Sequence, residues 1–399
     1  MNSSSPLSGV RVLDVATMLA APFCATFLGE FGAEVIKLEV PGQGDGFRRF
    51  GTQSAAGSYN WLNENRNKKS VTLDLRTPQG QEIFRGLIAH CDILVENFRP
   101  GTLEKWNLGY DELKRIKPEL ILVSVTAYGQ TGPRRDRPGF ARLAHAFAVF
   151  AHTTGEAEGP PLMPGALSLG DYVTGMYATM GALVAYIARS RFGFGQAVDV
   201  SLYESMFRVM DEMVSVYASK GFVRGRMGAE VSNVVPHSHY PTADGKWVAI
   251  ACSTDRMFER LAEAMGRVDL LERGAFATMQ LRLAKRDELN GLIAAWTRSF
   301  DRDALVAHAI AHDVPVAEVY DVADIFADEH FRARRTFVEY KDSRVGTVVG
   351  PNVFPKLSVT PGAVHSLGPD LGQHNREIYT DLLGIPPQRL DELVAQGVI

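Results

Sequence analysis

The sequence predicts an α/β fold with a parallel sheet, because two patterns alternate along its amino-terminal third. Short apolar runs typical of buried strands alternate with segments whose apolar residues recur at helical spacing. A helix between two such strands makes a right-handed crossover, so the strands lie parallel with helices on both faces. At 399 residues the chain is also too long for one small core, which predicts a second domain.

The predicted elements of the first domain follow one another without interruption. A strand at 10–15, a helix at 21–32 and a strand at 34–39 form the first β-α-β unit. The alternation continues with strands at 70–75, 93–96, 120–125 and 196–200 and helices at 78–90, 111–117, 139–151 and 202–220. A long helix rich in small residues leads from Asp171 to Arg189. We therefore expect a doubly wound layer.

A change of composition marks the end of this domain. Residues 221–226 are rich in glycine and arginine, and the pattern beyond them predicts a smaller α+β domain. Its predicted strands are 246–252 and 314–320, and its helices are 255–265, 286–300 and 303–312. The last part contains predicted strands at 336–340, 347–349 and 356–358 and helices at 377–383 and 387–396. We expect a large domain over 1–222, a small domain over 223–328, and a return of 329–399 to the large domain.

Composition and charge exclude several classes of protein. The net charge of −4 gives no electrostatic footprint for nucleic acid, and no uncharged apolar run is long enough for a membrane helix. Residues 1–6 lack the basic and apolar parts of a signal peptide. The widely spaced Cys24, Cys91 and Cys252 argue against a disulfide framework and a zinc site. We expect a cytoplasmic protein with no metal, nucleic-acid partner or membrane partner.

The turn after the first strand, residues 16–22, contains no glycine. A dinucleotide fold would carry G-x-G-x-x-G there, and a G-x-x-x-x-G-K-[ST] loop is absent as well. The large domain is therefore Rossmann-like, but the sequence does not support NAD or ATP. Basic segments at 42–49, 63–69 and 132–138 lie near predicted strand ends. Together they predict an anionic ligand, with a solvated basic turn as the alternative for each.

Residues 164–175 deliver a single carboxylate, Asp171, to the start of the long helix. Asp is a favoured N-cap, and Asp171 with Thr174 three residues later fits a plain helix start. The N–H groups of a helix start also stabilise an anion, and Gly170 leaves one side of the carboxylate open to a ligand. From spacing alone, a structural cap and a catalytic nucleophile both stay open.

Many stretches of the chain, in order, resemble the family III coenzyme A transferases, the group that contains formyl-CoA transferase and carnitine CoA-transferase. Leu169-Gly-Asp171 with Thr174-Gly175 is similar to the active-site motif of that family. The other matching stretches are 12–14, 20–22, 32–39, 69–75, 95–101, 129–133, 313–320, 326–330, 372–375 and 397–399. No one stretch is decisive, but their common order is specific and covers essentially the whole chain.

This resemblance implies an interlocked homodimer whose large domain is made from both chain ends. It also implies an enzyme without a permanently bound cofactor, which uses coenzyme A and acyl-CoA as substrates. Asp171 would attack the donor thioester to give an acyl-aspartyl anhydride, which the CoA thiolate converts to an aspartyl-CoA thioester. The acceptor acid would then enter through a second anhydride. Such covalent catalysis divides one hard exchange into easier steps, provided that water is excluded.

The family's coenzyme A contacts correspond to defined positions of this chain. Leu19 and Ala20 would line the pantetheine end. The remaining contacts correspond to Leu73, Asp74, Leu75, Arg76, Asn97, Phe98, Arg99, Lys105, Arg137 and Phe140. Of these, Leu73, Leu75 and Phe98 would pack against adenine or pantetheine. Arg76, Lys105 and Arg137 would face phosphates, which suit guanidinium forks and ammonium charges.

Three departures from the family pattern argue against formate and oxalate as substrates. Formyl-CoA transferase has Gln where this chain has Leu19. Many members have an acid after an aromatic residue near the active Asp, whereas here Ala141 follows Phe140. Residues 236–240 stand in place of the glycine-rich loop that shields the intermediate in formyl-CoA transferase.

Four residues are candidates for binding the acyl group or the acceptor: Arg142, His145, His237 and His239. An arginine beside the pocket would pair with the distal carboxylate of a dicarboxylate. We therefore expect succinyl-CoA as donor and a small dicarboxylate as acceptor, with surface or core roles for these side chains as the alternative. Monocarboxylates such as carnitine-type or aryl acids also stay open.

Two other functions share the expected fold. An α-methylacyl-CoA racemase needs a His–Asp pair of bases, but the His of the racemase corresponds to Phe140 here. A coenzyme A-binding protein without turnover is the second alternative, against which the presence of Asp171 argues.

Overall fold

The computed structural model describes residues 5–165 and 167–399. Residues 1–4, on which part of the signal-peptide argument rests, and Ala166 of the segment before Asp171 lie outside the described residues. The chain divides into two compact units. The first comprises the described residues of Met1–Phe150, Met163–Phe222 and Arg334–Ile399, and the second comprises Ala151–Leu162 and Val223–Ala333.

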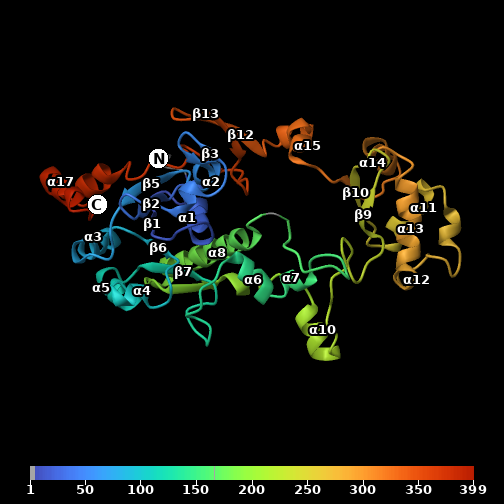
Figure 1. Ribbon diagram of the computed structural model, residues 1–399, viewed down its shortest axis with the longest axis horizontal. Helices are drawn as coiled ribbons and strands as arrows, with labels where there is room; N and C mark the ends of the chain where they lie inside the picture. Colours follow the sequence, from blue (N-terminus) through green and yellow to red (C-terminus); the bar gives the residue numbers. More distant parts are fainter. Residues whose placement is uncertain (1–4, 166) are drawn as a thin grey trace. The chain divides into compact units, whose positions relative to one another are not determined.

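A six-stranded sheet, parallel throughout, forms the centre of the first unit, which confirms the predicted fold class (Figure 1). The strands lie in the order β5 (Lys68–Thr72), β2 (Glu34–Glu39), β1 (Arg11–Asp14), β6 (Ile93–Glu96), β7 (Ile121–Thr126) and β8 (Ala197–Ser201). The order reverses between β1 and β6. In sheets of this kind, ligands bind at that reversal, beyond the carboxyl ends of the strands.

Helices cover both faces of this sheet. On one face α1 (Ala20–Glu30) and α8 (Leu169–Phe192) bury a core with the even-numbered positions of β1, such as Val12. Gly175 lets the two helices approach closely, because a Cβ there would lie 2.7 Å from the Ala20 carbonyl oxygen. The opposite face carries α3 (Pro78–Ala89), α4 (Thr102–Lys105), α5 (Tyr110–Ile116), η3 (Glu377–Leu382) and α17 (Pro387–Ala395). Figure 1 shows α1 and α8 together, and α17 beside α3.

Smaller elements surround this layer. They are η1 (Gly46–Arg49), β3 (Gln53–Ser54), β4 (Gly57–Ser58), α2 (Tyr59–Glu64), and an antiparallel hairpin of β12 (Phe337–Asp342) and β13 (Gly346–Pro351). The predicted strand at 356–358 does not form, and the strand predicted over 70–75 ends at Thr72.

Two predicted helices are each broken in two. The expected helix at 139–151 is α6 (Ala141–Phe147) followed by α7 (Phe150–Thr153), and Val149 between them has a φ of 70°. The helix expected over 202–220 is α9 (Leu202–Phe207) followed by α10 (Met213–Lys220), with Asp211 at a φ of 56°. A residue with a positive φ ends a right-handed helix. Neither valine nor aspartate in a sequence reliably predicts a positive φ.

The second unit is built on an antiparallel sheet with β10 (Trp247–Ala251) between β9 (His237–Pro241) and β11 (Val316–Glu318). Its helical elements are α11 (Asp255–Ala264), η2 (Val268–Leu271), α12 (Met279–Ala284), α13 (Arg286–Thr297), α14 (Arg302–Ala311), α15 (Val322–Ala327) and α16 (Glu329–Ala333). One face of the sheet, including Val248 and Ile250, packs into their apolar core. Of residues 236–240, which stand in place of the family's glycine-rich loop, 237–240 belong to strand β9.

Three further observations concern the described residues alone. Cys24, Cys91 and Cys252 are buried free thiols. No cluster of three metal-ligating side chains occurs within 5–165 and 167–399. None of the helices in that part of the chain combines the length and the apolar character that crossing a membrane requires.

Candidate active site

The candidate site begins at the carboxyl ends of β1 and β6, where the strand order reverses. The turn after β1 and the loop after β6 are joined by Asn97, whose side-chain amide binds the backbone of Thr17 twice. The Thr17 N–H donates to Asn97 Oδ1 at 2.9 Å, and Asn97 Nδ2 donates to the Thr17 carbonyl at 2.8 Å. Asn97, predicted as a coenzyme contact, therefore uses its side chain to hold the two loops together.

Leu19 and Ala20, the predicted pantetheine contacts, lie between this turn and α1. Both are buried within the chain. Leu19 packs with Phe47 and Trp61 in a small apolar cluster, and Tyr172 borders the same cluster. The turn after β1 is thus connected by packing to the residue that follows Asp171.

Asp171 lies in the first turn of α8. The helix begins at Leu169, so the N-cap is Ser168, and the interpretation of Asp171 as the cap is wrong. Within the described residues, the Asp171 carboxylate has no hydrogen bond or ion pair. Burial alone raises its pKa from 3.8 to about 6. A desolvated carboxylate whose oxygens have no partner is a typical candidate for a reacting group.

His145 lies behind the Asp171 turn. Its side chain is fully buried, and its Nε2 accepts the Gly170 N–H at 3.2 Å. Burial, with the nearby charge of Arg142, lowers the His145 pKa and keeps the ring neutral. Because Nε2 accepts, the ring proton is assigned to Nδ1, which has no partner among the described residues. His145 was predicted to contact substrate; its ring contacts the backbone beside Asp171, and the substrate contact stays a prediction.

Gly170 is required for this contact. A Cβ at position 170 would lie 2.8 Å from His145 Nε2 and 3.3 Å from the Ala141 Cβ. The sequence suggested that Gly170 opens one side of the carboxylate to a ligand. The structure shows that it admits α6 to the start of α8.

Tyr172 fixes the Asp171 turn from the other side. Its hydroxyl donates to Glu64 Oε1 of α2 at 3.0 Å, and its ring packs edge-on against Phe23 of α1 with centroids 5.0 Å apart. Burial raises the pKa of Glu64, and burial with the Glu64 carboxylate raises the pKa of Tyr172. Neither residue was predicted as part of the site. They are 108 positions apart in the sequence, so no local pattern indicates that they pair.

Several predicted nucleotide contacts have partners within the chain. Leu73 and Leu75 belong to the apolar core, at 1% and 5% exposure, so most of the surface of each side chain is used in core packing. Phe98 packs edge-on against Trp106, with centroids 5.4 Å apart. Asp74 and Arg76 bind each other, with both side-chain contacts at 2.8 Å. Arg76 is 67% exposed in this pair.

Three of the predicted coenzyme contacts are exposed cations without a carboxylate partner: Arg99, Lys105 and Arg137. None of the three forms an ion pair within residues 5–165 and 167–399, so each guanidinium or ammonium group is free for a phosphate. Arg48 is not free, because it pairs with Glu39 and stacks on Trp61 at 3.7 Å. The first basic segment therefore supports the fold rather than a ligand.

The predicted coenzyme contact Phe140 and the predicted substrate residue Arg142 are exposed at the start of α6, whereas His145 of the same helix is buried. Phe140 precedes the helix and is 71% exposed, and Arg142 is exposed in its first turn. Arg142 is near enough to His145 to influence its pKa. The helix that contacts Gly170 through His145 thus also carries the Arg142 guanidinium group, which has no ion pair within residues 5–165 and 167–399.

His237 and His239 belong to the second unit. They lie two residues apart on β9 and share the face opposite the buried Tyr240. With Ser238, Trp247 and Glu230, His239 lines a cavity of about 460 Å³ in that unit.

Comparison with known proteins gives three results. The sequence profile of CoA-transferase family III matches residues 7–375. The beta subunit of succinyl-CoA–L-malate CoA-transferase from Chloroflexus aurantiacus is 49% identical over 397 residues, which is 99% of this chain and 98% of that protein. Succinyl-CoA–D-citramalate CoA-transferase from the same organism is 45% identical over 395 residues, or 99% and 98% of the two chains.

A solved structure is similar over the same length. The crystal structure of a CAIB/BAIF family protein from Brucella suis superposes with a TM-score of 0.84 at 33% identity. The likeness covers 95% of this chain and 100% of that one.

Proposed function

Because this chain belongs to CoA-transferase family III and is a CoA-transferase, we propose that it moves coenzyme A from succinyl-CoA to a small dicarboxylic acid, with Asp171 as nucleophile. The observation that carries this proposal is the Asp171 carboxylate, which is desolvated and without a partner among the described residues. Relatives named for succinyl-CoA with L-malate or D-citramalate support this donor and a hydroxy-dicarboxylate acceptor.

The reaction consists of four displacements at acyl carbons. An Asp171 oxygen attacks the succinyl carbonyl, the C–S bond breaks, and CoA leaves as thiolate. The thiolate attacks the Asp171 carbonyl of the anhydride, which releases succinate and leaves an aspartyl-CoA thioester. The acceptor carboxylate displaces CoA again, and the thiolate then takes the acceptor acyl group and frees Asp171. No net proton or electron is exchanged, so the cycle needs only carboxylates and thiolate.

The elevated pKa of Asp171 suits this cycle. A carboxylate with a pKa of about 6 is mostly ionised at neutral pH, yet it is more nucleophilic than one with an ordinary pKa. Its partial burial also favours the exclusion of water from the anhydride. Arg99, Lys105 and Arg137 would hold the phosphates of coenzyme A, and Arg142 would pair with the distal carboxylate of the acyl group.

We further propose that two chains form the active enzyme. Met176, Met180, Val184 and Ile187 follow one another along α8 and are 46–65% exposed, an apolar row that a second chain would cover. The homodimer is our expectation, and size-exclusion chromatography with light scattering at several concentrations tests it. Relatives are named as alpha and beta subunits, so activity that requires a second, different chain would contradict the homodimer.

Trapping of the covalent intermediate tests the mechanism. The protein is incubated with succinyl-CoA, other acyl-CoAs or none, quenched with hydroxylamine, and mapped by peptide mass spectrometry. We expect a hydroxamate on Asp171 only with a reactive acyl-CoA, and none in Asp171→Asn. Formation of the hydroxamate only with thioesters of monocarboxylic acids would contradict the proposed dicarboxylate specificity. Exchange of the α-proton with deuterated water without any adduct would favour a racemase, and absence of both signals would leave only coenzyme A binding.

A further inference from the structure

The turn between β1 and α1 has the position of a phosphate-binding glycine loop, but it contains no glycine. Each residue from Ala16 to Met18 is held instead by a side chain from elsewhere in the first unit. The Thr17 backbone is bound by Asn97 through both of its hydrogen-bonding groups. The other two residues are bound by a group of buried charges on β1, β2 and the loop after β2.

Ala16 is bound by the charges at the ends of β1 and β2. Its N–H donates to Asp14 Oδ1 at 3.1 Å, and its carbonyl accepts from the Lys37 ammonium group. Lys37 also lies 3.6 Å from Asp14 and 3.1 Å from Asp45, and its side chain has no exposed surface. The backbone of this residue is therefore fully satisfied by two ions of opposite sign.

Met18 has the least favourable backbone of the turn. Its φ of 66° is left-handed, which costs energy for a residue with a side chain. Its N–H donates to both oxygens of Asp45, at 3.0 and 3.2 Å. Asp45 Oδ1 also caps η1 by accepting the Phe47 N–H at 2.9 Å. One buried carboxylate thus joins the strained residue to the loop after β2.

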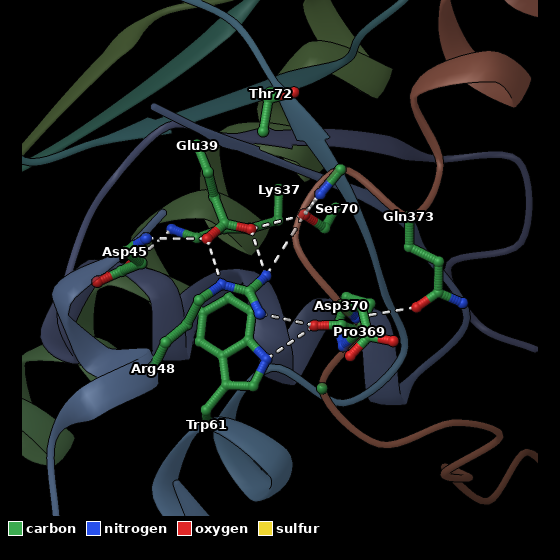
Figure 2. Close-up of polar contacts among 12 residues, drawn as sticks. Lys37, Glu39, Asp45, Arg48, Trp61, Ser70, Thr72, Pro369, Asp370 and Gln373 are labelled. Atoms are coloured by element: carbon green, nitrogen blue, oxygen red, sulfur yellow. Dashed lines mark hydrogen bonds and ion pairs between the residues drawn. The ribbon is translucent and has the colours of Figure 1, made fainter. Parts of the chain in front are cut away.

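Asp45 is itself fixed by its neighbours, as Figure 2 shows. The Asp45 N–H donates to Glu39 Oε2 at 2.9 Å. Glu39 accepts from Nε and Nη2 of Arg48, at 2.8 and 2.7 Å, and from the Ser70 hydroxyl at 2.6 Å. Asp45 therefore cannot move without disturbing several ion pairs and hydrogen bonds.

The turn leads directly to the candidate site. Leu19 and Ala20 follow Met18, and the Ala20 carbonyl is the closest contact that a Cβ at Gly175 would meet. Gly175 lies four residues after Asp171, on the same side of α8. A change in the turn would therefore shift the segment expected to contact acyl-CoA relative to Asp171.

We infer that Asp45 is a positioning residue for CoA transfer: by holding Met18 in the left-handed conformation, it sets the place of Leu19 and Ala20 against which the thioester is aligned with Asp171. This inference rests on the proposed function. The Asp45 side chain is only 1% exposed, so its effect passes through the backbone of the turn. The ion pair with Lys37 lets a carboxylate be buried at this position.

Two pairs of variants test the inference. Asp45→Asn keeps an acceptor for the Met18 N–H, whereas Asp45→Leu has a similar shape and none. Met18→Leu and Met18→Ile have the same composition, but only Ile is branched at Cβ and resists a positive φ. The second pair leaves the buried charges untouched, so it remains informative if Asp45→Leu does not fold. Glu30→Gln, which breaks the buried Glu30–Arg66 pair away from the turn, is the control.

The readouts are kcat and KM for succinyl-CoA, the Kd of free coenzyme A by calorimetry, and Tm. We expect kcat/KM to fall about 100-fold in Asp45→Leu, since a misplacement near 1 Å costs about that much. The kcat/KM of Asp45→Asn should be close to that of the wild type. The kcat/KM of Met18→Ile should be well below that of Met18→Leu. Glu30→Gln should leave kcat/KM unchanged.

Three results would overturn the inference. They are an unchanged kcat/KM in Asp45→Leu, an equal loss in both Asp45 variants, and equal values for Met18→Leu and Met18→Ile. Failure of the proposed function is a separate result, because the wild-type protein would then show no succinyl-CoA exchange. In that case the Kd of coenzyme A still decides the role of the turn: equal affinity in the wild type and in both variant pairs would refute it.

Discussion

Replacement of the candidate nucleophile should stabilise the protein while it abolishes transfer. Burial raises the pKa of Asp171 from 3.8 to about 6. The neutral carboxyl group is therefore favoured by folding, and this contribution is complete below about pH 4 and lost as the pH rises through 6. At pH 8 the wild type carries a desolvated anion, whereas Asp171→Asn has a neutral group of the same shape.

The size of the effect follows from the pKa. A rise from 3.8 to about 6 corresponds to about 3 kcal/mol, at about 1.4 kcal/mol for each pKa unit. The dipole of α8 favours the anion by up to about 1 kcal/mol. We therefore expect Asp171→Asn to be more stable than the wild type by about 2 kcal/mol at pH 8, or about 4 °C in Tm.

The assay is a series of thermal melts of both proteins between pH 4 and pH 8 at one protein concentration. The difference in Tm should shrink as the pH falls and vanish near pH 4, where both side chains are neutral. Glu96 titrates in the same range, since burial raises its pKa to about 7. It contributes equally to both proteins, so it cancels in the difference.

Asp111→Asn is the matched control. Asp111 also lies in the first turn of a helix, α5, but its ion pair with Lys114 lowers its pKa. It should therefore show no stabilisation at pH 8. A Tm of Asp171→Asn that equals or falls below the wild type at pH 8, or a difference independent of pH, would refute the reasoning.

Three further predictions concern the surroundings of Asp171. His145→Leu removes the acceptor of the Gly170 N–H and should lower kcat about tenfold, whereas His145→Gln keeps an acceptor and should retain most of it; equal kcat values would contradict the positioning role. Gly170→Ala brings a Cβ within 2.8 Å of His145 Nε2 and should cost about 1–3 kcal/mol in urea unfolding, which Gly170→Ala with His145→Ala should partly restore. Arg142→Ala should raise KM for succinyl-CoA about tenfold and leave KM for a monocarboxyl thioester unchanged, and an equal change for both thioesters would remove the basis for a distal carboxylate contact.

The sheet was predictable because its strands are short apolar runs. Residues such as Val12, Ile36 and Val71 point to buried strands, and the intervening helices dictate parallel pairing. The breaks at Val149 and Asp211 were not predicted, since each has a positive φ that the apolar spacing of the sequence does not reveal. Strand 70–75 was predicted too long because its apolar pattern continues through Leu73 and Leu75 into a turn.

The site was predictable in its motif but not in its contacts. Asp171 follows from the resemblance, and its position on α8 follows from helical patterning. His145 contacts Gly170, which is 25 positions away in the sequence, and Tyr172 pairs with Glu64, which is 108 positions away. No local pattern in the sequence distinguishes a histidine that faces a ligand from one that accepts a backbone N–H.

The buried charged residues are the clearest example of contacts that the sequence did not predict. Lys37 and Glu39 stand on the face of β2 that an ordinary sheet would fill with apolar side chains. Such charges are costly to bury unless they are paired and hydrogen-bonded. Here Lys37 and Glu39 both bind Asp45, and Asp45 holds the turn at Met18.

The consequence reaches the carboxy-terminal part of the chain. Arg48 Nη1 and Trp61 Nε1 both donate to the Pro369 carbonyl, at 3.0 and 2.9 Å, as Figure 2 shows. Through Arg48 and Glu39 this carbonyl is linked to Asp45 and so to the turn beside the candidate site. A substitution that displaces the backbone near Pro369 should therefore weaken CoA transfer through the same turn, although its position in the sequence is far from every predicted ligand contact.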